Sequence, residues 1–365
     1  MLDSKKLQSA LFSCFLVLTP LLFNPLDGSV ERVKFIVLCI FSLIFYLLKR
    51  TDKINEIFKW TIVLLIFFGF ISTILSQDIY LAFWGSPERC FGFAAFLSAM
   101  MLALGIPKID YKSLINFFIV SGTLSTLAAI ILGIFSQDSL FEGRISGTLG
   151  NPNLLGQFLA VTLFFGIYRF IEKRNKIDLI HVLIQAFGLL LSGNRASIFA
   201  LILVTIIYVI HTKKSWKVIS LFAILPIISL FFISDRIFAG QSILTRIEIY
   251  SSAIKAIIKT PFFGSGFEHV QNVLMLPSSY TMIADRVHQL FLDFAVMAGI
   301  PFTITLIVLS VFTLIVLFKK QPVFGFAFLA LLLSLQVGFM GIVNLIQFSI
   351  FVGLAIGLSH TRFSR

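Results

Sequence analysis

The chain has 365 residues, of which 58% are hydrophobic and only 13% are charged, and its mean hydropathy is +1.00. Soluble globular domains carry about a quarter charged residues. The composition therefore excludes an ordinary cytosolic enzyme, a disordered protein and a nucleic-acid-binding domain of the usual kind. The formal net charge of +12 has to be explained by where the basic residues lie.

Apolar runs long enough to cross a bilayer as a helix recur along the whole sequence. We predict about twelve of them, near 9–24, 33–48, 58–75, 91–106, 114–135, 153–170, 178–193, 196–211, 217–233, 289–318, 323–341 and 345–359. None has the short alternating pattern of a membrane barrel, and the run near 289–318 is long enough to tilt or to extend past the bilayer. Residues 1–365 are therefore expected to form a single all-α, polytopic membrane domain with a helical external loop near 234–288.

The basic residues predict which side each connection faces, because cytoplasmic loops are rich in Lys and Arg. With the amino terminus inside and strict alternation, the cytoplasmic segments hold 19 of the 29 basic residues and six acidic ones, whereas the outer side is near neutral. Both termini are then cytoplasmic, and the charge of +12 mostly reflects orientation. The first run follows Lys5 and Lys6 without a small-residue cleavage site, so we expect a retained anchor.

A helix is predicted in the long external loop from Gln241 to Thr260, because this stretch lacks Gly and Pro and is followed by a stop signal of Pro261, Gly264 and Gly266. We expect its apolar face to lie against the membrane domain. The expected apolar face holds Ile243, Ile247, Tyr250, Ile254 and Ile257, opposite a stripe of Glu248, Ser252, Lys255 and Lys259. Arg246 stands on the apolar side, either as a snorkelling or ion-paired side chain or as an arginine held over a cavity to meet an anion.

Three further arginines lie at the outer ends of predicted spans. Arg195 sits between two apolar runs with almost no loop around it, and Arg89 and Arg144 end outer loops directly before helices. Each can be a snorkelling residue. Guanidinium also binds phosphate bidentately, which lysine cannot do, so together with Arg246 these residues indicate a lipid-linked phosphate or pyrophosphate.

The stretch Gly147–Asn153 opens the sixth span. Asn151 is a good helix N-cap and Pro152 a good first helical residue. The glycine pair at 147 and 150 permits close approach of a ligand or a neighbouring helix, and the helix amino terminus favours an anion. Asn151 and Asn153 are therefore secondary binding candidates.

His288 begins the tenth span, and Asp293 follows about a turn and a half later. A lone histidine at a helix start is often structural. A histidine with a carboxylate near a basic pocket is also a suitable general base, and Asp293 is the candidate that orients it.

Several common site patterns are absent from the sequence. We find no cluster with metal-ligand spacing, no Walker loop, no Gly-x-Ser-x-Gly elbow and no His-Glu-x-x-His. Cys14, Cys39 and Cys90 form no obvious disulfide pair. Cytoplasmic nucleotide chemistry is therefore not expected.

Taken together, four segments resemble motifs of the O-antigen ligase and O-antigen polymerase superfamily of bacterial membrane glycosyltransferases. The segments are Gly147–Asn153, the Ser-Gly-Asn-Arg-Ala-Ser stretch around Arg195, the Arg246-led helix ending in Pro-Phe-Phe-Gly-Ser-Gly, and His288-Gln289 followed, after nine intervening residues, by Gly299. The resemblance covers roughly 140–310. Asn194 before the arginine, Ala196 after it, and Phe302 at the last ligase position depart from the family pattern.

The resemblance implies transfer of a glycan from an undecaprenyl-pyrophosphate carrier to an acceptor hydroxyl at the outer face of the bacterial inner membrane, with neither metal nor nucleotide cofactor. In that scheme Arg195 and Arg246 bind the pyrophosphate, and His288 accepts the acceptor's proton. The His-Gln-x9-Gly match favours a ligase acting on a lipid A-core. Polymerisation of repeat units and transfer to protein stay open, and a transporter of lipid-linked sugars is a more distant alternative.

Overall fold

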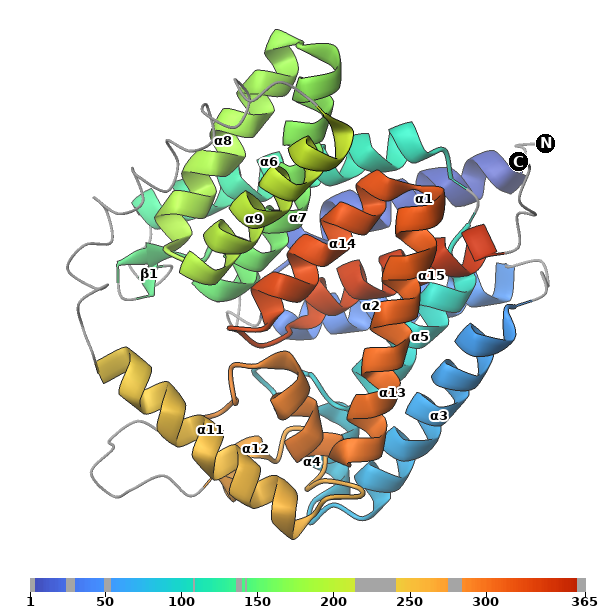
Figure 1. Cartoon of the computed structure of the whole chain (residues 1–365), viewed down its shortest axis with the longest axis vertical. Coiled ribbons are helices and arrows are strands. Elements are labelled where there is room, and N and C mark those ends of the chain that lie inside the picture. Colours follow the sequence, from blue (N-terminus) through green and yellow to red (C-terminus); the bar gives the residue numbers. More distant parts are fainter. Residues whose placement is uncertain are drawn as a thin grey trace. The chain divides into compact units, whose positions relative to one another are not determined.

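The structure is a computed structural model that describes residues 4–23, 30–48, 54–107, 109–135, 140–141, 143–213, 241–274 and 284–359. Figure 1 shows that helices dominate it. The helices are α1 (Ser4–Leu18), α2 (Glu31–Leu48), α3 (Glu56–Ile74), α4 (Ile79–Trp84), α5 (Phe93–Gly105), α6 (Tyr111–Phe135), α7 (Pro152–Lys173), α8 (Lys176–Ser192), α9 (Arg195–Thr212), α11 (Gln241–Lys259), α12 (Val270–Val273), α13 (Leu290–Lys320), α14 (Pro322–Leu335) and α15 (Ile342–Ser359). Two-residue strands β1 (Leu140–Phe141) and β2 (Arg144–Ile145) pair as an antiparallel hairpin.

Eleven of the twelve predicted apolar runs coincide with these helices, and the run near 217–233 lies outside the described residues. In the described part of the chain, α3, α6, α7, α9, α13 and α15 are long and apolar enough to cross a membrane. The predicted helical class is confirmed, while the number of about twelve spans stays a prediction.

The chain separates into two compact units, which we describe one at a time. Unit 1 comprises Met1–Val37, Ile106–Ser234 and Leu317–Ser334, and unit 2 comprises Leu38–Gly105, Asp235–Val316 and Leu335–Arg365.

In unit 1, α7 is the central helix and packs against α6, α8 and α9. Its large apolar side chains, among them Phe158 and Phe164, are buried. The Thr162 hydroxyl of α7 donates a hydrogen bond to Gln185 Oε1 of α8 at 2.7 Å. Such pairs join helices where apolar contact alone discriminates little between protein and lipid.

In unit 2, α5 packs along α15, and α3 and α4 pack against α5. An aromatic cluster fills the space beside α5, where the Phe302 ring lies 5.1 Å from that of Phe96 and stacks at 5.5 Å on that of Phe294. Phe302 is fully buried. The residue that departs from the ligase pattern therefore has a packing role in this chain.

Helix α13 corresponds to the long apolar run near 289–318, but it is not one straight span. Gly299 adopts φ 87° and ψ 171° inside it, and Pro301 follows two residues later. A proline lacks the amide hydrogen that a continuous helix needs, so the run is divided into a short segment that begins at Leu290 and a longer one that ends at Lys320.

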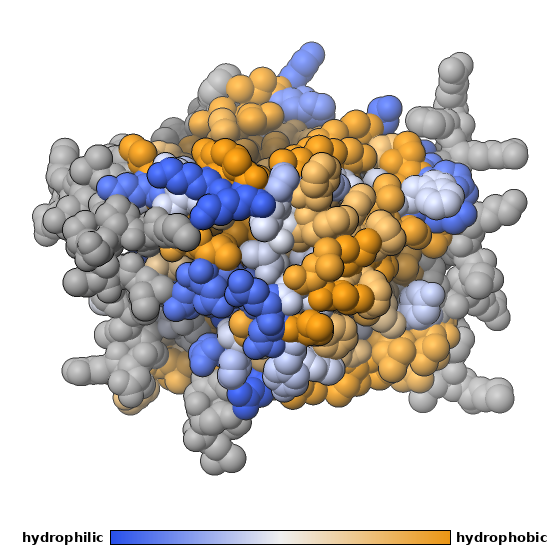
Figure 2. Space-filling view, turned by 90° about the horizontal axis from the view of Figure 1, so that it is seen from below, coloured by the Kyte–Doolittle hydropathy of each residue, from blue (hydrophilic) through white to orange (hydrophobic). Residues whose placement is uncertain are grey.

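Helix α11 has the predicted extent, but the buried face is not the predicted one. Ile249, Ala253 and Ser252 are buried, although Ser252 was placed in the polar stripe, whereas Ile247 and Ile254 are 58% and 50% exposed. Small side chains let a helix approach its neighbours closely, and apolar side chains of a membrane protein need not be buried in protein. Figure 2 shows hydrophilic and hydrophobic side chains in separate patches on the face seen from below.

Candidate active site

Unit 2 places His288 immediately before α13, in a backbone conformation with φ +58° that non-glycine residues seldom adopt. The imidazole and the Phe339 ring meet edge to face, with centroids 5.4 Å apart. The Tyr250 hydroxyl donates to the His288 carbonyl oxygen at 3.4 Å. The predicted base is thus held by α11 on its backbone and by an aromatic ring on its side chain.

The surroundings of His288 disfavour a positive charge on its imidazole. Burial, followed by the charges of Arg246, Arg89 and Arg286, lowers its pKa from 6.5 to about 4. The imidazole is therefore neutral at physiological pH, and a neutral imidazole can accept a proton. Three guanidinium groups therefore act electrostatically on one ring.

Arg246 projects from α11 and is half-buried. Its Nη1 donates to the Val337 carbonyl oxygen at 3.3 Å, and its charge acts on His288. The assignment of Arg246 as a pyrophosphate ligand stays a prediction.

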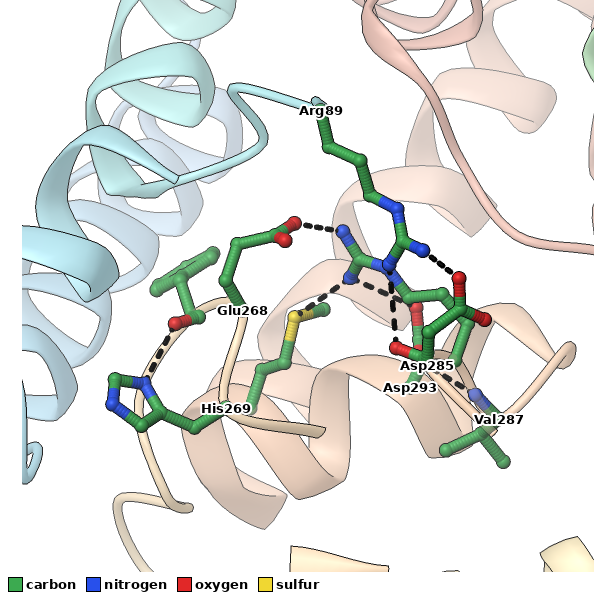
Figure 3. Close-up of polar contacts among 9 residues, drawn as sticks. Arg89, Glu268, His269, Asp285, Val287 and Asp293 are labelled. Carbon is green, nitrogen blue, oxygen red and sulfur yellow. Dashed lines mark hydrogen bonds and ion pairs between the residues drawn. The ribbon is translucent and has the colours of Figure 1, made fainter. Parts of the chain in front are cut away.

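Arg286, two residues before His288, is 1% exposed and lies between two carboxylates. It forms an ion pair with Glu268 and a second one with Asp293, at 3.3 Å. Its guanidinium also lies 5.0 Å from the centre of the Phe91 ring. Figure 3 shows Glu268 on the loop before α12 and Asp293 on α13, with their carboxylates directed toward one guanidinium.

Asp293 was predicted to orient His288, and the structure shows which group it contacts. One carboxylate oxygen accepts a hydrogen bond from the Arg286 guanidinium, and the other accepts one from the Val287 N–H at 3.0 Å. Asp293 therefore fixes the backbone directly before His288. The assignment of Asp293 as the residue that orients His288 stays a prediction. In this structure Asp293 would act through the Val287 backbone and not by contact with the imidazole.

Arg89 lies in the connection between α4 and α5 and forms an ion pair with Asp285 (Figure 3). Its Nη1 also donates to the Asp285 carbonyl oxygen at 3.4 Å. The Arg89 side chain is 27% exposed. This pair anchors the start of the segment that carries His288.

Two motifs that are separate in the sequence form one junction in unit 2. The loop Pro261–Gly266, at the end of α11, enters the break in α13: the Ile300 N–H donates to the Pro261 carbonyl at 2.8 Å, and the Ser265 N–H donates to the Val296 carbonyl at 2.9 Å. A Cβ on Gly299 would lie 2.3 Å from the Phe262 carbonyl oxygen. Glycine is therefore required at Gly299, and the junction links the helix of Arg246 to the helix that follows His288.

Unit 1 holds the other predicted residues. Asn151 caps α7 by accepting the Asn153 N–H at 2.8 Å, as predicted. Asn194 caps α9 through the Ser197 N–H at 3.1 Å and also donates to the Asn153 carbonyl at 2.8 Å. The amino termini of α7 and α9 therefore lie together, which explains asparagine before the family arginine.

Arg195 is the first residue of α9. A positive charge there is opposed by the helix dipole, which favours anions at this end. Arg144 lies over Gly193, whose missing side chain leaves room for it, and its Nη1 reaches Asn153 Oδ1 at 3.5 Å. Arg144 of β2 therefore lies beside the amino terminus of α7, and Arg195 begins α9.

The glycine pair has a structural explanation as well. Both glycines have positive φ, and a Cβ on Gly147 would lie 2.5 Å from the Ala129 Cβ of α6. Gly147 therefore permits approach of a neighbouring helix. The adjacent Thr148 carbonyl accepts a hydrogen bond from the fully buried Lys34.

Sequence reasoning missed Glu268, Gln336, Phe339 and Lys34, and it treated Arg286 only as a neighbour of His288. Their partners are distant in the sequence, so no local pattern marks them. Among the described residues, no group of three or more His, Cys, Asp or Glu is placed to hold a metal ion.

These observations define a helical protein with apolar spans and a half-buried, neutral histidine subject to the charges of three arginines. Residues 180–307 match the family model for O-antigen ligase (Wzy_C). The chain is also 23% identical over 205 residues to a ComP-specific O-oligosaccharyltransferase from Acinetobacter baylyi (strain ATCC 33305 / BD413 / ADP1). That match covers 48% of this chain and only 36% of the relative.

Residues 180–307 are therefore similar to O-antigen ligases, and the superfamily resemblance drawn from the motifs is confirmed. The matched region contains Arg195, Arg246 and His288. Together with the six membrane-compatible helices in the described residues, this match indicates a multi-pass membrane protein with a region related to O-antigen ligases.

Proposed function

We propose that this protein transfers a glycan from an undecaprenyl-pyrophosphate carrier to an acceptor hydroxyl at the outer face of the bacterial inner membrane, as an O-antigen ligase-like enzyme with both termini in the cytoplasm. The observation that carries the proposal is His288, neutral at physiological pH and subject to the charges of Arg246, Arg89 and Arg286. A base and several phosphate-binding groups are what such a transfer requires.

The proposed reaction uses His288 as the general base. The acceptor hydroxyl gives its proton to the imidazole as its oxygen bonds to the anomeric carbon of the donor. The bond between that carbon and the pyrophosphate oxygen breaks, and undecaprenyl pyrophosphate leaves with the electron pair. Arg246 and, at the start of α9, Arg195 are assigned to the negative charge that develops on the leaving group.

The charges that lower the pKa of His288 also give a reason for ordered binding. A pyrophosphate placed against Arg246 or Arg89 adds negative charge near the ring, and a nearby negative charge raises the pKa of a histidine. The base therefore becomes stronger when the donor is bound. In this scheme guanidinium groups do the work that a divalent cation does in many reactions with phosphate leaving groups.

Three activities fit this reaction, and they differ in the identity of the acceptor. Ligation to a lipid A-core is the first, on the strength of the His288-Gln289 motif followed by Gly299. The similarity to a ComP-specific O-oligosaccharyltransferase makes transfer to protein the second candidate. Polymerisation of repeat units is the third.

The test is to supply membranes containing this protein with a radiolabelled lipid-linked glycan and to identify what becomes labelled. Label on lipid A-core, on protein or on a growing glycan assigns the activity. Label that crosses sealed vesicles while still attached to its carrier would instead support a transporter and contradict the proposal.

A further inference from the structure

The connection between α14 and α15, residues 336–341, contacts the candidate site at three points. The Val337 carbonyl accepts from Arg246, Gln336 Oε1 accepts from Gln289 Nε2 at 2.7 Å, and Phe339 meets the His288 ring. No sequence motif marks this connection, and it lies outside the region 180–307 that matches the ligase family.

The connection is anchored on its α15 side. Phe339 is 8% exposed, and of the residues of α15 all but Gly357 and Ser359 are buried. The first turn of α15 is closed by the Leu345 N–H, which donates to the Gly341 carbonyl at 2.9 Å. A segment held in this way can position what it touches.

Gln289 links this connection to the start of α13. Its Oε1 accepts the Leu292 N–H at 2.5 Å, which satisfies one of the free amides of the helix amino terminus. Its Nε2 donates to Gln336. Both ends of the amide are therefore fixed, and with them the peptide that follows the left-handed His288.

Phe339 packs against the imidazole of His288. The two rings meet edge to face, at an interplanar angle of 70°. An aromatic ring in this position limits both the rotation of the imidazole and the approach of water.

We propose that residues 336–341 are the third component of the candidate site, and that Gln336 and Phe339 are positioning residues that hold His288 in the orientation needed for proton transfer. This inference rests on the proposed function for its chemistry, but its geometric content can be tested without activity. Neither residue is assigned contact with the substrate.

The first test measures how readily His288 reacts with diethyl pyrocarbonate in the purified full-length protein, with the exposed His211 as internal reference. Gln336→Met and Phe339→Ala should raise the relative labelling of His288 several-fold, and Phe339→Leu should raise it less. The matched changes Gln271→Met and Phe70→Ala, at exposed positions, should not raise it. Unchanged labelling in both Gln336→Met and Phe339→Ala would overturn the proposal.

The second test measures transfer against pH. Gln336→Met should slow it by about 10-fold to 100-fold, because a small misplacement of a reacting group has effects of that size. Gln336→Glu keeps the acceptor for Gln289 and should retain most of the rate, while its added charge, opposing those of Arg246, Arg89 and Arg286, moves the low-pH limb upward.

Equal losses in Gln336→Met and Gln336→Glu, or no loss in either, would contradict the positioning role. If the unaltered protein transfers no glycan at all, the proposed function fails, and the labelling result still decides whether residues 336–341 hold His288.

Discussion

A guanidinium nitrogen of Arg286 lies 3.3 Å from a carboxylate oxygen of Asp293, and both side chains are almost completely buried. Glu268 pairs with the same guanidinium. Removing one partner of a buried ion pair leaves an uncompensated charge, which lowers the free energy of unfolding by about 3–5 kcal/mol.

We therefore expect Arg286→Met to destabilise unit 2 by that amount, because it leaves the two carboxylates beside each other without their counter-ion. Thermal unfolding of the purified protein in detergent measures the change. Arg174→Met, at an exposed site, is the matched control and should alter the midpoint little. Equal midpoints for the two variants would show that the buried network does not stabilise this part of the chain.

The junction between the loop Pro261–Gly266 and α13 makes a second prediction. Gly299→Ala should destabilise the protein by about 1–3 kcal/mol from the backbone conformation alone, and more because its Cβ would overlap the Phe262 carbonyl. Gly357→Ala is the control, since nothing lies within 4 Å of the added atom. In α15 that change should be neutral or slightly stabilising.

The cap of α7 at Asn151 was predicted, because helix caps are local, whereas Asn194 was noted only as a departure from the family pattern and the structure shows it to be the cap of α9. Asn151 with Pro152, and Gly193 with Asn194, carry their own signals within two residues. The junction at Gly299 carried a weaker signal: its Gly and Pro were visible but lay inside one uninterrupted apolar run.

Other features could not be predicted because they depend on tertiary packing. Arg286 meets Glu268 across 18 positions, and Gln289 meets Gln336 across 47. The prediction of which face of α11 is buried was wrong, because helical periodicity identifies an apolar stripe without indicating whether protein or lipid covers it. Small residues such as Ser252 and Ala253 face the protein instead.

The lowered pKa of His288 predicts how stability changes with pH. An unfolded chain takes up a proton on this histidine near its ordinary value of 6.5, whereas the folded chain does so only near 4. The stabilisation is therefore complete above pH 6.5 and is lost as the pH falls toward 4, by about 3 kcal/mol in total. Unfolding midpoints of the unaltered protein and of His288→Gln across this range should diverge, and parallel curves would contradict the burial of a neutral imidazole.

Substitution of Arg246 separates its charge from its geometry. Arg246→Lys keeps a positive charge near His288, so the low-pH limb of transfer should stay in place while the rate falls, because lysine cannot bind phosphate bidentately. Arg246→Ala removes a charge that lowers the pKa of His288, so that pKa should rise and the limb should move to higher pH. A pH profile of initial rates distinguishes the two variants, and identical profiles would argue against an electrostatic link between Arg246 and the base.

The most direct test of the proposed mechanism is the rate of label transfer from lipid-linked glycan in membranes that contain His288→Ala, Arg195→Ala or Arg246→Ala at matched protein levels. Loss of the base should slow transfer by about 10²–10⁴-fold, and loss of either arginine by about 10²–10³-fold. Full transfer by all three variants would contradict the assignment of His288 as base and of the two arginines as pyrophosphate ligands.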